Sequence, residues 1–275
     1  MNIFEAVILG IVQGLTEFLP VSSSGHLVLL QKIFKIENRS LFFDTMLHAG
    51  TLVSVFIVLW KDIWALIKKP FQKLMLFLII ATIPAVIAAL AFNDSIEEIF
   101  RSARLLGWCF LITTALLVTA EMLSRRAVKN NNLKKAGNMN WLDALIIGLM
   151  QAIAIPPGIS RSGATISGAL FRKLDRDFAA RFSFLMSIPA ILGAVVLQTK
   201  DLIKNSAVSS AGTSEFSFGA FPVIAGTLTA AIVGFFAVKF MLKIIRERSL
   251  LGFAVYTGVL GIMVILDQAV TRIVF

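Results

Sequence analysis

The chain has 275 residues, of which 57% are hydrophobic and only 15% are charged, against the roughly 25% charged share of an ordinary soluble domain. With a mean hydropathy of +0.86, this composition excludes a soluble globular domain and indicates an integral membrane protein. The net charge of +10 would suit a nucleic-acid partner, but membrane proteins gather Lys and Arg in cytoplasmic loops, so we expect no nucleic acid.

The chain opens with MNIFEAVILG, which has no basic residue and carries Glu5, so we expect no cleavable signal peptide. Residues 3–16 and 142–155 form two short apolar arms, each followed by a break that contains proline and glycine. As helices of 14 residues at ~1.5 Å per residue, the arms reach only ~21 Å, short of the ~30 Å hydrocarbon core. We therefore predict that both arms enter the membrane and turn back, with the two turns buried against each other.

Longer apolar segments approach or exceed the ~18–20 residues that cross a bilayer. In chain order they are residues 41–60, 74–92, 105–123, 182–199, 216–238 and 249–266. The segment 105–123 contains the single cysteine, Cys109, which excludes an intrachain disulfide and supports no cysteine metal site.

The sequence repeats itself after 138 positions, where PVSSSG (20–25) aligns with GISRSG (158–163). We interpret residues 1–128 and 140–275 as two copies of one unit within a single membrane domain, residues 1–275. Each copy holds one re-entrant arm and three spans, an odd number, so the copies have opposite orientations. We predict an all-α integral membrane protein, an inverted-topology repeat with six full transmembrane helices and two re-entrant helix hairpins.

The loops agree with this arrangement. Most of the 26 Lys and Arg residues fall in loops that the predicted topology places on one side of the membrane. That side is expected to be cytoplasmic.

Each break is followed by serines and a second helix, SSSGHLVLLQ at 22–31 and SRSGATISGALF at 160–171. Serine is a good N-cap, and a helix N-terminus offers unpaired N–H groups and a partial positive charge to an anion. Two such termini would form an anion pocket, to which Arg161 adds a guanidinium that matches phosphate oxygens. The candidate phosphate-binding residues are Ser22, Ser24, Gly25, Ser160, Arg161, Ser162, Gly163 and Thr165.

The first break also carries groups that phosphoryl transfer or hydrolysis can use. A serine hydroxyl needs a neighbouring base, and His26 is a natural base or acid beside the serines at 22–24. Glu17 either orients His26 or binds a divalent cation, with Gln13 nearby. The spacing leaves the nucleophile open among Ser23, His26 and water.

A purely structural role is the alternative for these residues. Charged groups inside a membrane are costly, which favours function for Glu17, His26 and Arg161, whereas each serine is equally well explained as a helix cap. Asp44 and His48 are four residues apart on one predicted helix face. For them we favour a local hydrogen bond over catalysis.

The segments QGLTEFLPVSSSGHL (13–27) and PGISRSGATISG (157–168) resemble the two signatures of the bacterial undecaprenyl-diphosphate phosphatase family, also known for bacitracin resistance. The similarity extends over the whole chain and includes FDTMLHAGTL (43–52) and FSFLMSIPA (182–190). The resemblance implies a membrane hydrolase that removes the terminal phosphate from a C55 lipid diphosphate. Such an enzyme regenerates the lipid carrier for peptidoglycan synthesis.

Carried over by motif position, the resemblance implies Glu17, Ser23 and His26 as catalytic groups, together with Arg161 as the phosphate-binding arginine. It implies a divalent cation, magnesium or calcium, although some members carry glutamate where this chain has Gln13. It also implies the bacterial plasma (inner) membrane, with paired re-entrant hairpins and an active site open to the outer face.

We therefore predict hydrolysis of undecaprenyl diphosphate to undecaprenyl phosphate and inorganic phosphate. The expected partners are the lipid diphosphate substrate and membrane lipids, and a homodimer is one option for the assembly. The alternative is a polyprenyl-phosphate flippase or an anion transporter, because inverted repeats with broken helices are also a transporter design. The nucleophile and base on one hairpin favour the enzyme, since binding alone does not need them.

Overall fold

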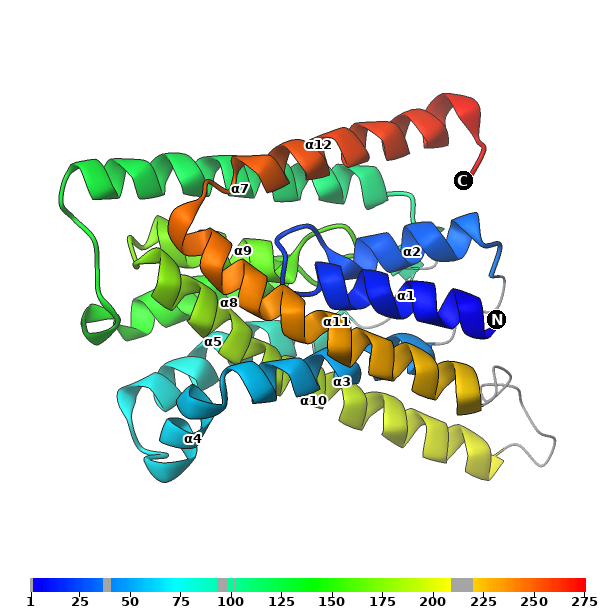
Figure 1. Cartoon of the computed structure of the whole chain (residues 1–275), viewed down its shortest axis with the longest axis horizontal. Coiled ribbons are helices and arrows are strands. Elements are labelled where there is room, and N and C mark those ends of the chain that lie inside the picture. The colour runs from blue at the N-terminus through cyan, green and yellow to red at the C-terminus, as the bar shows by residue number, and fades with distance from the viewer. Residues whose placement is uncertain (1, 37–40, 93–97, 101, 209–219) are drawn as a thin grey trace.

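The computed structural model describes residues 2–36, 41–92, 98–100, 102–208 and 220–275. Within these ranges the regular structure is helical, apart from an isolated bridge between Lys134 and Leu174. The helices, drawn in Figure 1, are α1 (Ile3–Thr16), α2 (Ser23–Ile33), α3 (Leu41–Val58), α4 (Trp60–Lys68), α5 (Lys73–Ala91), α7 (Leu106–Lys129), η1 (Ala136–Asn138), α8 (Trp141–Ile153), α9 (Arg161–Phe171), α10 (Arg176–Val208), α11 (Ala220–Glu247), α12 (Leu251–Leu266) and η2 (Asp267–Thr271). The predicted all-α class is confirmed for the described residues.

Five of the described helices are long and apolar enough to cross a membrane, namely α5, α7, α10, α11 and α12. A sixth crossing results if α3 and α4 count as one span, although the chain bends by 79° between them. The predicted apolar segments coincide with these helices, except that residues 216–219 of one segment lie outside the described residues. The helices therefore have the lengths and composition of a multi-pass membrane protein.

Two shorter helix hairpins accompany the long helices, because α1 turns back into α2 and α8 turns back into α9 (Figure 1). Both first arms begin with an asparagine N-cap in a capping box, Asn2 with Glu5 and Asn140 with Asp143. In each box the acidic side chain accepts from the asparagine N–H, while the asparagine side chain accepts from the acidic residue's N–H. The two boxes are 138 positions apart, the same spacing as the serine segments.

A serine caps the start of the second helix in each hairpin, as the sequence predicts. Ser22 Oγ accepts from the Gly25 N–H (3.3 Å), and Ser160 Oγ accepts from the Gly163 N–H (3.0 Å). These bonds satisfy N–H groups that a helix start leaves without intrahelical partners. Both breaks are therefore capped helix starts inside the apolar part of the protein.

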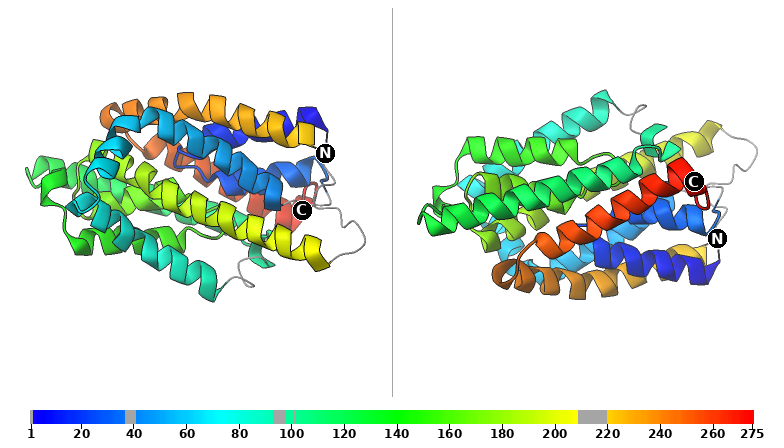
Figure 2. Two further views of the ribbon diagram at one scale, coloured as in Figure 1. Left: turned by 90° about the horizontal axis from the view of Figure 1, so that it is seen from below. Right: turned by 90° about the horizontal axis from the view of Figure 1, so that it is seen from above.

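The short arm of each half packs against a long helix of the other half. The arm α1 lies along α11 and its counterpart α8 lies along α5, while α7 pairs with α12 and α3 with α10 (Figures 1 and 2). A Cβ on Gly10 would collide with the Gly226 carbonyl, and a Cβ on Gly148 would collide with the Ala81 carbonyl. Because only glycine admits such a close backbone approach, the matched glycines allow both arms to sit directly against a long helix.

The first turn is embedded in the main hydrophobic core. Phe18, two residues after the end of α1, is fully buried and meets Phe184 of α10 edge to face, with ring centroids 5.3 Å apart. Leu117 of α7 and Ile166 of α9 belong to the same core. Packing of Phe18 therefore fixes the backbone next to Glu17.

Candidate active site

The two hairpin turns meet inside the protein. The Gly158 N–H donates to the Ser22 hydroxyl (3.1 Å), and the Ser162 hydroxyl donates to the Leu19 carbonyl (2.9 Å). A Cβ on Gly25 would lie 2.9 Å from the Gly158 Cα, so the two backbones touch. The predicted contact between the turns is present, and it gives these buried polar groups hydrogen-bond partners.

The second turn is also held by α7. Thr113 Oγ1 accepts from the Ser160 N–H (2.9 Å) and donates to the Gly158 carbonyl (3.0 Å). Gly158 itself has a φ of +96°, a conformation that favours glycine. Thr113 thereby positions the start of α9, and with it Arg161. Nothing in the sequence identifies this threonine, which is one of several in an apolar span.

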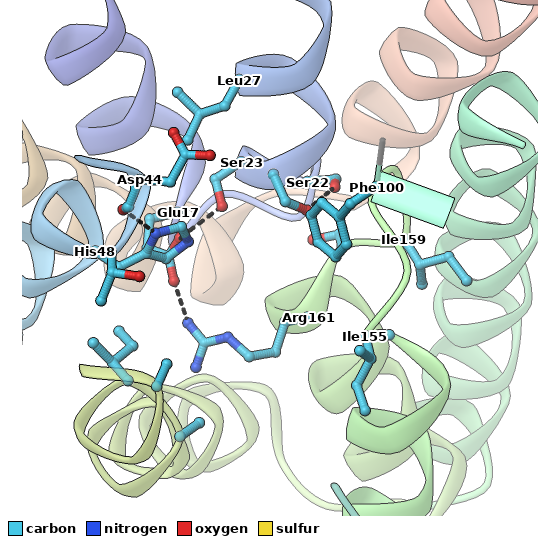
Figure 3. A pocket seen from close by; sticks show the side chains of 17 residues that line it. Glu17, Ser22, Ser23, Leu27, Asp44, His48, Phe100, Ile155, Ile159 and Arg161 are labelled. Carbon is cyan, nitrogen blue, oxygen red and sulfur yellow. Dashed lines mark hydrogen bonds and ion pairs between the residues drawn. The ribbon is translucent and has the colours of Figure 1, made fainter. Parts of the chain in front are cut away.

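Glu17 lies at the junction of the two hairpins (Figure 3). Arg161 Nη2 donates to Glu17 Oε1 (2.6 Å), whereas Ser23 Oγ (2.6 Å) and Gln13 Nε2 (2.9 Å) donate to Glu17 Oε2. Only 3% of the Glu17 side chain is exposed. A buried carboxylate is tolerated when it is paired with a cation and hydrogen-bonded, and both oxygens of Glu17 meet this condition.

His48 of α3 also faces Glu17, with its Nε2 3.5 Å from Glu17 Oε2. Its Nδ1 lies 2.7 Å from the Asp44 backbone carbonyl. Because a carbonyl only accepts, Nδ1 carries a proton, and Nε2 is left facing the carboxylate. The local contact expected between Asp44 and His48 thus exists through the Asp44 backbone, while the Asp44 carboxylate accepts from Gln31 Nε2 (2.8 Å). The structure brings His48 into the site, which the sequence alone did not favour.

His26 lies behind the first turn. Its Nδ1 donates to the Ser22 carbonyl (2.7 Å), and its Nε2 lies 2.7 Å from the Tyr256 hydroxyl of α12. The His26 ring also meets Phe110 edge to face, with centroids 5.5 Å apart. The structure therefore brings together Glu17, Ser23 and Arg161, whereas His26 contacts α7 and α12 and does not line the cavity beside them.

A cavity of about 280 Å³ opens at this junction. Its lining combines charged and polar side chains with apolar ones, as the labelled residues in Figure 3 show. The polar lining includes Glu17, Ser23, His48 and Arg161, and the apolar lining includes Leu27, Phe100, Ile155, Ile159, Ala190, Ile191 and Ala194. Such a cavity suits an amphiphilic molecule with a charged head and a hydrocarbon tail.

The predicted phosphate-binding residues divide into two groups. Ser22, Ser24, Ser160 and Arg161 line the cavity, whereas Gly25, Ser162, Gly163 and Thr165 do not. Thr165 Oγ1 instead donates to the Arg161 carbonyl (2.8 Å) and lies 2.6 Å from the Ser183 hydroxyl of α10. The second group therefore supports the turn from behind.

The residues at hand fit a divalent cation that arrives with its substrate. Among the described residues, no group of three or more His, Cys, Asp or Glu side chains could hold a metal ion. However, Gln13 Oε1 is buried beside the Glu17 carboxylate and has no hydrogen-bond partner within the described ranges. Mg²⁺ is commonly bound by one or two carboxylates together with substrate phosphates, rather than by an all-protein cage.

Comparison with known proteins gives matches over almost the whole chain. Residues 6–263 match the family model described as "Bacitracin resistance protein BacA". The chain is 49% identical over 268 residues, 98% of both chains, to "Undecaprenyl-diphosphatase 4" of Bacillus thuringiensis subsp. konkukian (strain 97-27). It is 48% identical over 269 residues, again 98% of both chains, to the "Undecaprenyl-diphosphatase" of Carboxydothermus hydrogenoformans.

A more distant relative is the "Undecaprenyl-diphosphatase" of Alkaliphilus metalliredigens, at 42% identity over 285 residues, which covers 97% of this chain and 98% of that protein. These matches include both hairpins and the long helices around them.

Proposed function

The chain belongs to the bacitracin resistance protein BacA family, and we propose that it is a phosphatase that hydrolyses undecaprenyl diphosphate to undecaprenyl phosphate and inorganic phosphate. The observation that carries this proposal is the Glu17 carboxylate with Arg161 on one oxygen and Ser23 on the other. A guanidinium that can bind phosphate, a hydroxyl and a carboxylate that can act as its base are thus in direct contact. This arrangement supports hydrolysis of a phosphoanhydride. The product would return as lipid carrier to peptidoglycan synthesis.

Arg161 is the proposed holder of the terminal phosphate. Its Nη2 donates to Glu17, but its Nη1 is buried and has no hydrogen-bond partner among the described residues. That nitrogen is therefore available to a phosphate oxygen, and the planar guanidinium suits two oxygens of one phosphate. The starts of α2 and α9, at Ser23 and Arg161, add partial positive charge to the cavity that both residues line.

Ser23 is the nucleophile that the hydrogen bonds support best. Its hydroxyl already donates to Glu17 Oε2, so the carboxylate can take the proton as Oγ attacks the terminal phosphorus. The new Oγ–P bond forms as the bond to the bridging oxygen breaks, and the electron pair leaves on undecaprenyl phosphate, which takes the proton from Glu17. Water then attacks the phosphorus of the phosphoserine, and the Glu17 carboxylate takes one proton from this water as the Oγ–P bond breaks. Glu17 gives that proton to Ser23 Oγ, and inorganic phosphate departs.

The two histidines have different proposed roles. His48 faces the reacting groups because its Nε2 is 3.5 Å from Glu17 Oε2. His26 acts as a positioning residue, since its Nδ1–H holds the Ser22 carbonyl and thereby the turn that carries Ser23.

A divalent cation, magnesium or calcium, is proposed to be held by the Glu17 carboxylate and Gln13 Oε1 together with the diphosphate. When bound, it would neutralise phosphate charge and make the terminal phosphorus easier to attack. The unpartnered Gln13 Oε1 supports this assignment.

We further propose that the fold is an inverted repeat of residues 1–128 and 140–275, with six crossings and two re-entrant hairpins. The exchanged packing of α1 with α11 and α8 with α5, the matched capping boxes and the matched glycines support it. The basic loops are then cytoplasmic, the protein lies in the bacterial plasma (inner) membrane, and the cavity opens to the outer face.

Phosphate release in detergent tests this function, because no membrane gradient exists there. Purified protein with Mg²⁺ or Ca²⁺ should release inorganic phosphate from undecaprenyl diphosphate. Arg161→Ala should lower this rate by about 10²–10³-fold, the usual effect of removing a donor from developing charge. Arg126→Ala, which changes an exposed arginine of α7 outside the cavity, is the matched control and should keep the wild-type rate.

No release by the wild-type protein would refute the enzyme and favour a polyprenyl-phosphate flippase or anion transporter. Equal rates for both arginine variants would refute the role of Arg161.

A further inference from the structure

A second hollow lies on the opposite side of the first turn. It has a volume of about 520 Å³ and is enclosed by the end of α1, the first turn and the junction of α11 with α12. Leu19 and Val21 face this hollow, while Glu17, Ser22 and Ser23 of the same turn face the active-site cavity. The two spaces share no lining residue, so the second hollow, here called the α11–α12 groove, is separate from the active-site cavity.

The groove is apolar along its walls and basic at one end. Its walls include Leu15, Leu19, Ile244 and Phe253, and the one charged lining residue is Arg248. Arg248 is exposed, and its side chain has no hydrogen bond or ion pair with any other described residue. The groove therefore combines a hydrocarbon-like surface with one uncompensated positive charge.

The position of the groove indicates a lipid as its occupant. Both α11 and α12 have the length and composition of membrane spans, so their outer surfaces face acyl chains. Arg248 lies in the short turn between them, where a span ends and lipid headgroups begin. Lys239, Lys243 and Arg246 lie just before this turn, which by the positive-inside rule belongs to the cytoplasmic leaflet.

We propose that the α11–α12 groove binds an anionic phospholipid of the inner leaflet, with its phosphate on Arg248 and an acyl chain along Leu19 and Phe253. A basic residue at the membrane surface attracts an anionic headgroup, whereas a zwitterionic headgroup brings a compensating positive charge. Tyr256 lines the groove, and its hydroxyl bonds to His26. The bound lipid therefore touches the residue that holds His26 behind the catalytic turn. The proposal is independent of the hydrolytic function.

Gly252 offers a direct way to close the groove. It lines the groove, and a Cβ built on it has no atom within 4 Å, so a side chain can be added without collision. Gly252→Phe should fill the groove and leave the fold intact, because glycine is in any case a poor helix residue. Val255→Phe is the matched control, since Val255 is exposed on the same helix and does not line the groove.

The test is native mass spectrometry of the full chain released from nanodiscs of equal parts phosphatidylglycerol and phosphatidylcholine. The wild-type protein should retain one phosphatidylglycerol in preference to phosphatidylcholine. Arg248→Gln should lower this preference about fivefold, the effect of one basic residue beside an anionic lipid. Gly252→Phe should abolish retention, whereas Val255→Phe and the surface control Arg126→Gln should not change it. Unfolding midpoints within a few degrees of wild type would show that each variant folds.

Three results would overturn the proposal. If Arg248→Gln and Arg126→Gln reduce the retention of phosphatidylglycerol equally, the lipid is attracted only by the basic surface in general. Retention by Gly252→Phe at the wild-type level would place the lipid elsewhere. Displacement of phosphatidylglycerol by equimolar undecaprenyl phosphate, in wild type but not in Gly252→Phe, would assign the groove to the prenyl phosphate instead.

Discussion

The two hairpins share one backbone design and differ in chemistry. Each has an asparagine capping box, a short arm packed through a glycine, and a serine cap at the break. At three positions aligned by the 138-residue offset, the first hairpin has Glu17, Ser23 and His26, and the second has Ile155, Arg161 and Ala164. The proposed nucleophile and base thus come from one hairpin and the proposed phosphate-binding cation from the other.

The matched glutamines show the same difference. Gln13 Nε2 donates to Glu17, whereas both amide atoms of Gln151 are buried without a partner in the described part of the chain, because Ile155 stands where the first hairpin has Glu17. The glutamine at this position makes a hydrogen bond only in the first hairpin, where a carboxylate lies opposite it. The two hairpins therefore differ in chemistry through a few side chains on the same backbone arrangement. Four pairs of substitutions can test this difference.

Substitution of Glu17 should have the largest effect. Glu17→Gln removes the proton acceptor of Ser23, so we expect phosphate release in detergent to fall by about 10²–10⁴-fold. Ile155→Val, at the aligned position, is a small apolar exchange and should keep the rate within about threefold. Initial rates at saturating substrate measure both, and an E17Q rate above a tenth of wild type would contradict the assignment of the base.

Substitutions of Ser23 and Ser24 should differ in their effect on the rate, by a smaller factor than the Glu17 pair. Ser23→Ala removes the proposed nucleophile and should lower the rate by at least about a hundredfold, with loss of any acid-stable phosphoserine trapped in mid-reaction. Ser24 lies 3.4 Å from the Ser22 hydroxyl and has no contact with Glu17, so Ser24→Ala should change the rate less than about threefold. Full turnover by the Ser23→Ala protein would assign the attack to water.

The glutamine pair should give a still smaller effect. Gln13→Leu removes a hydrogen bond to a buried carboxylate and should lower the rate about tenfold, since such bonds contribute roughly 1.5–3 kcal/mol. Gln151→Leu removes an amide that has no partner where the structure describes the chain, so activity should stay unchanged and the unfolding midpoint should stay equal or rise. Equal losses in both variants would show that Gln151 also serves the site.

Substitutions in the two capping boxes should change the stability of the protein to different extents. The Asp143 side chain is fully buried and accepts from Lys134 Nζ (3.0 Å) and Arg172 Nε (2.6 Å). Asp143→Asn therefore leaves two cations without their partner and should destabilise the protein by about 3 kcal/mol. Glu5→Gln affects an exposed cap and should destabilise it by about 0.5 kcal/mol. Chemical or thermal unfolding in detergent measures both.

The pH dependence provides a check on the Asp143 contacts. Burial works to raise the pKa of Asp143, but hydrogen bonds from Arg172, the Asn140 backbone and Lys134 outweigh it and hold the pKa below its ordinary value. A lowered pKa contributes stability that is present above the unfolded-state pKa of about 3.9 and is lost as the pH falls through the folded-state pKa. The stability difference between wild type and Asp143→Asn should be constant near neutral pH and shrink below about pH 4.

The sequence predicts a large part of the fold because its signals are local. The bounds of the first arm, the breaks and the serine caps follow from apolar length, proline, glycine and serine, all of which act within a few residues. The capping boxes of Asn2 and Asn140 carry an equally local signal at the same offset, so they too can be found from sequence. The 79° bend between α3 and α4 has no such signal, because the sequence around Leu59 contains no proline or glycine.

The site is less predictable because its contacts join distant segments. Arg161 and Glu17 can be paired from sequence through the repeat, which predicts that their turns meet. The direction of each histidine depends on which helix packs beside it. His26 meets Tyr256 of α12, and His48 reaches Glu17 only because α3 packs beside α1. A single sequence does not contain these helix pairings.

The ion pair between Arg161 and Glu17 has a consequence for turnover. The two charges neutralise each other at 2.6 Å, so the ion pair adds no net charge to the site. In the proposed reaction, the product phosphate and the Glu17 carboxylate then compete for the same guanidinium. Under this mechanism Glu17 is an intramolecular competitor of inorganic phosphate, and re-formation of the ion pair favours release of the product.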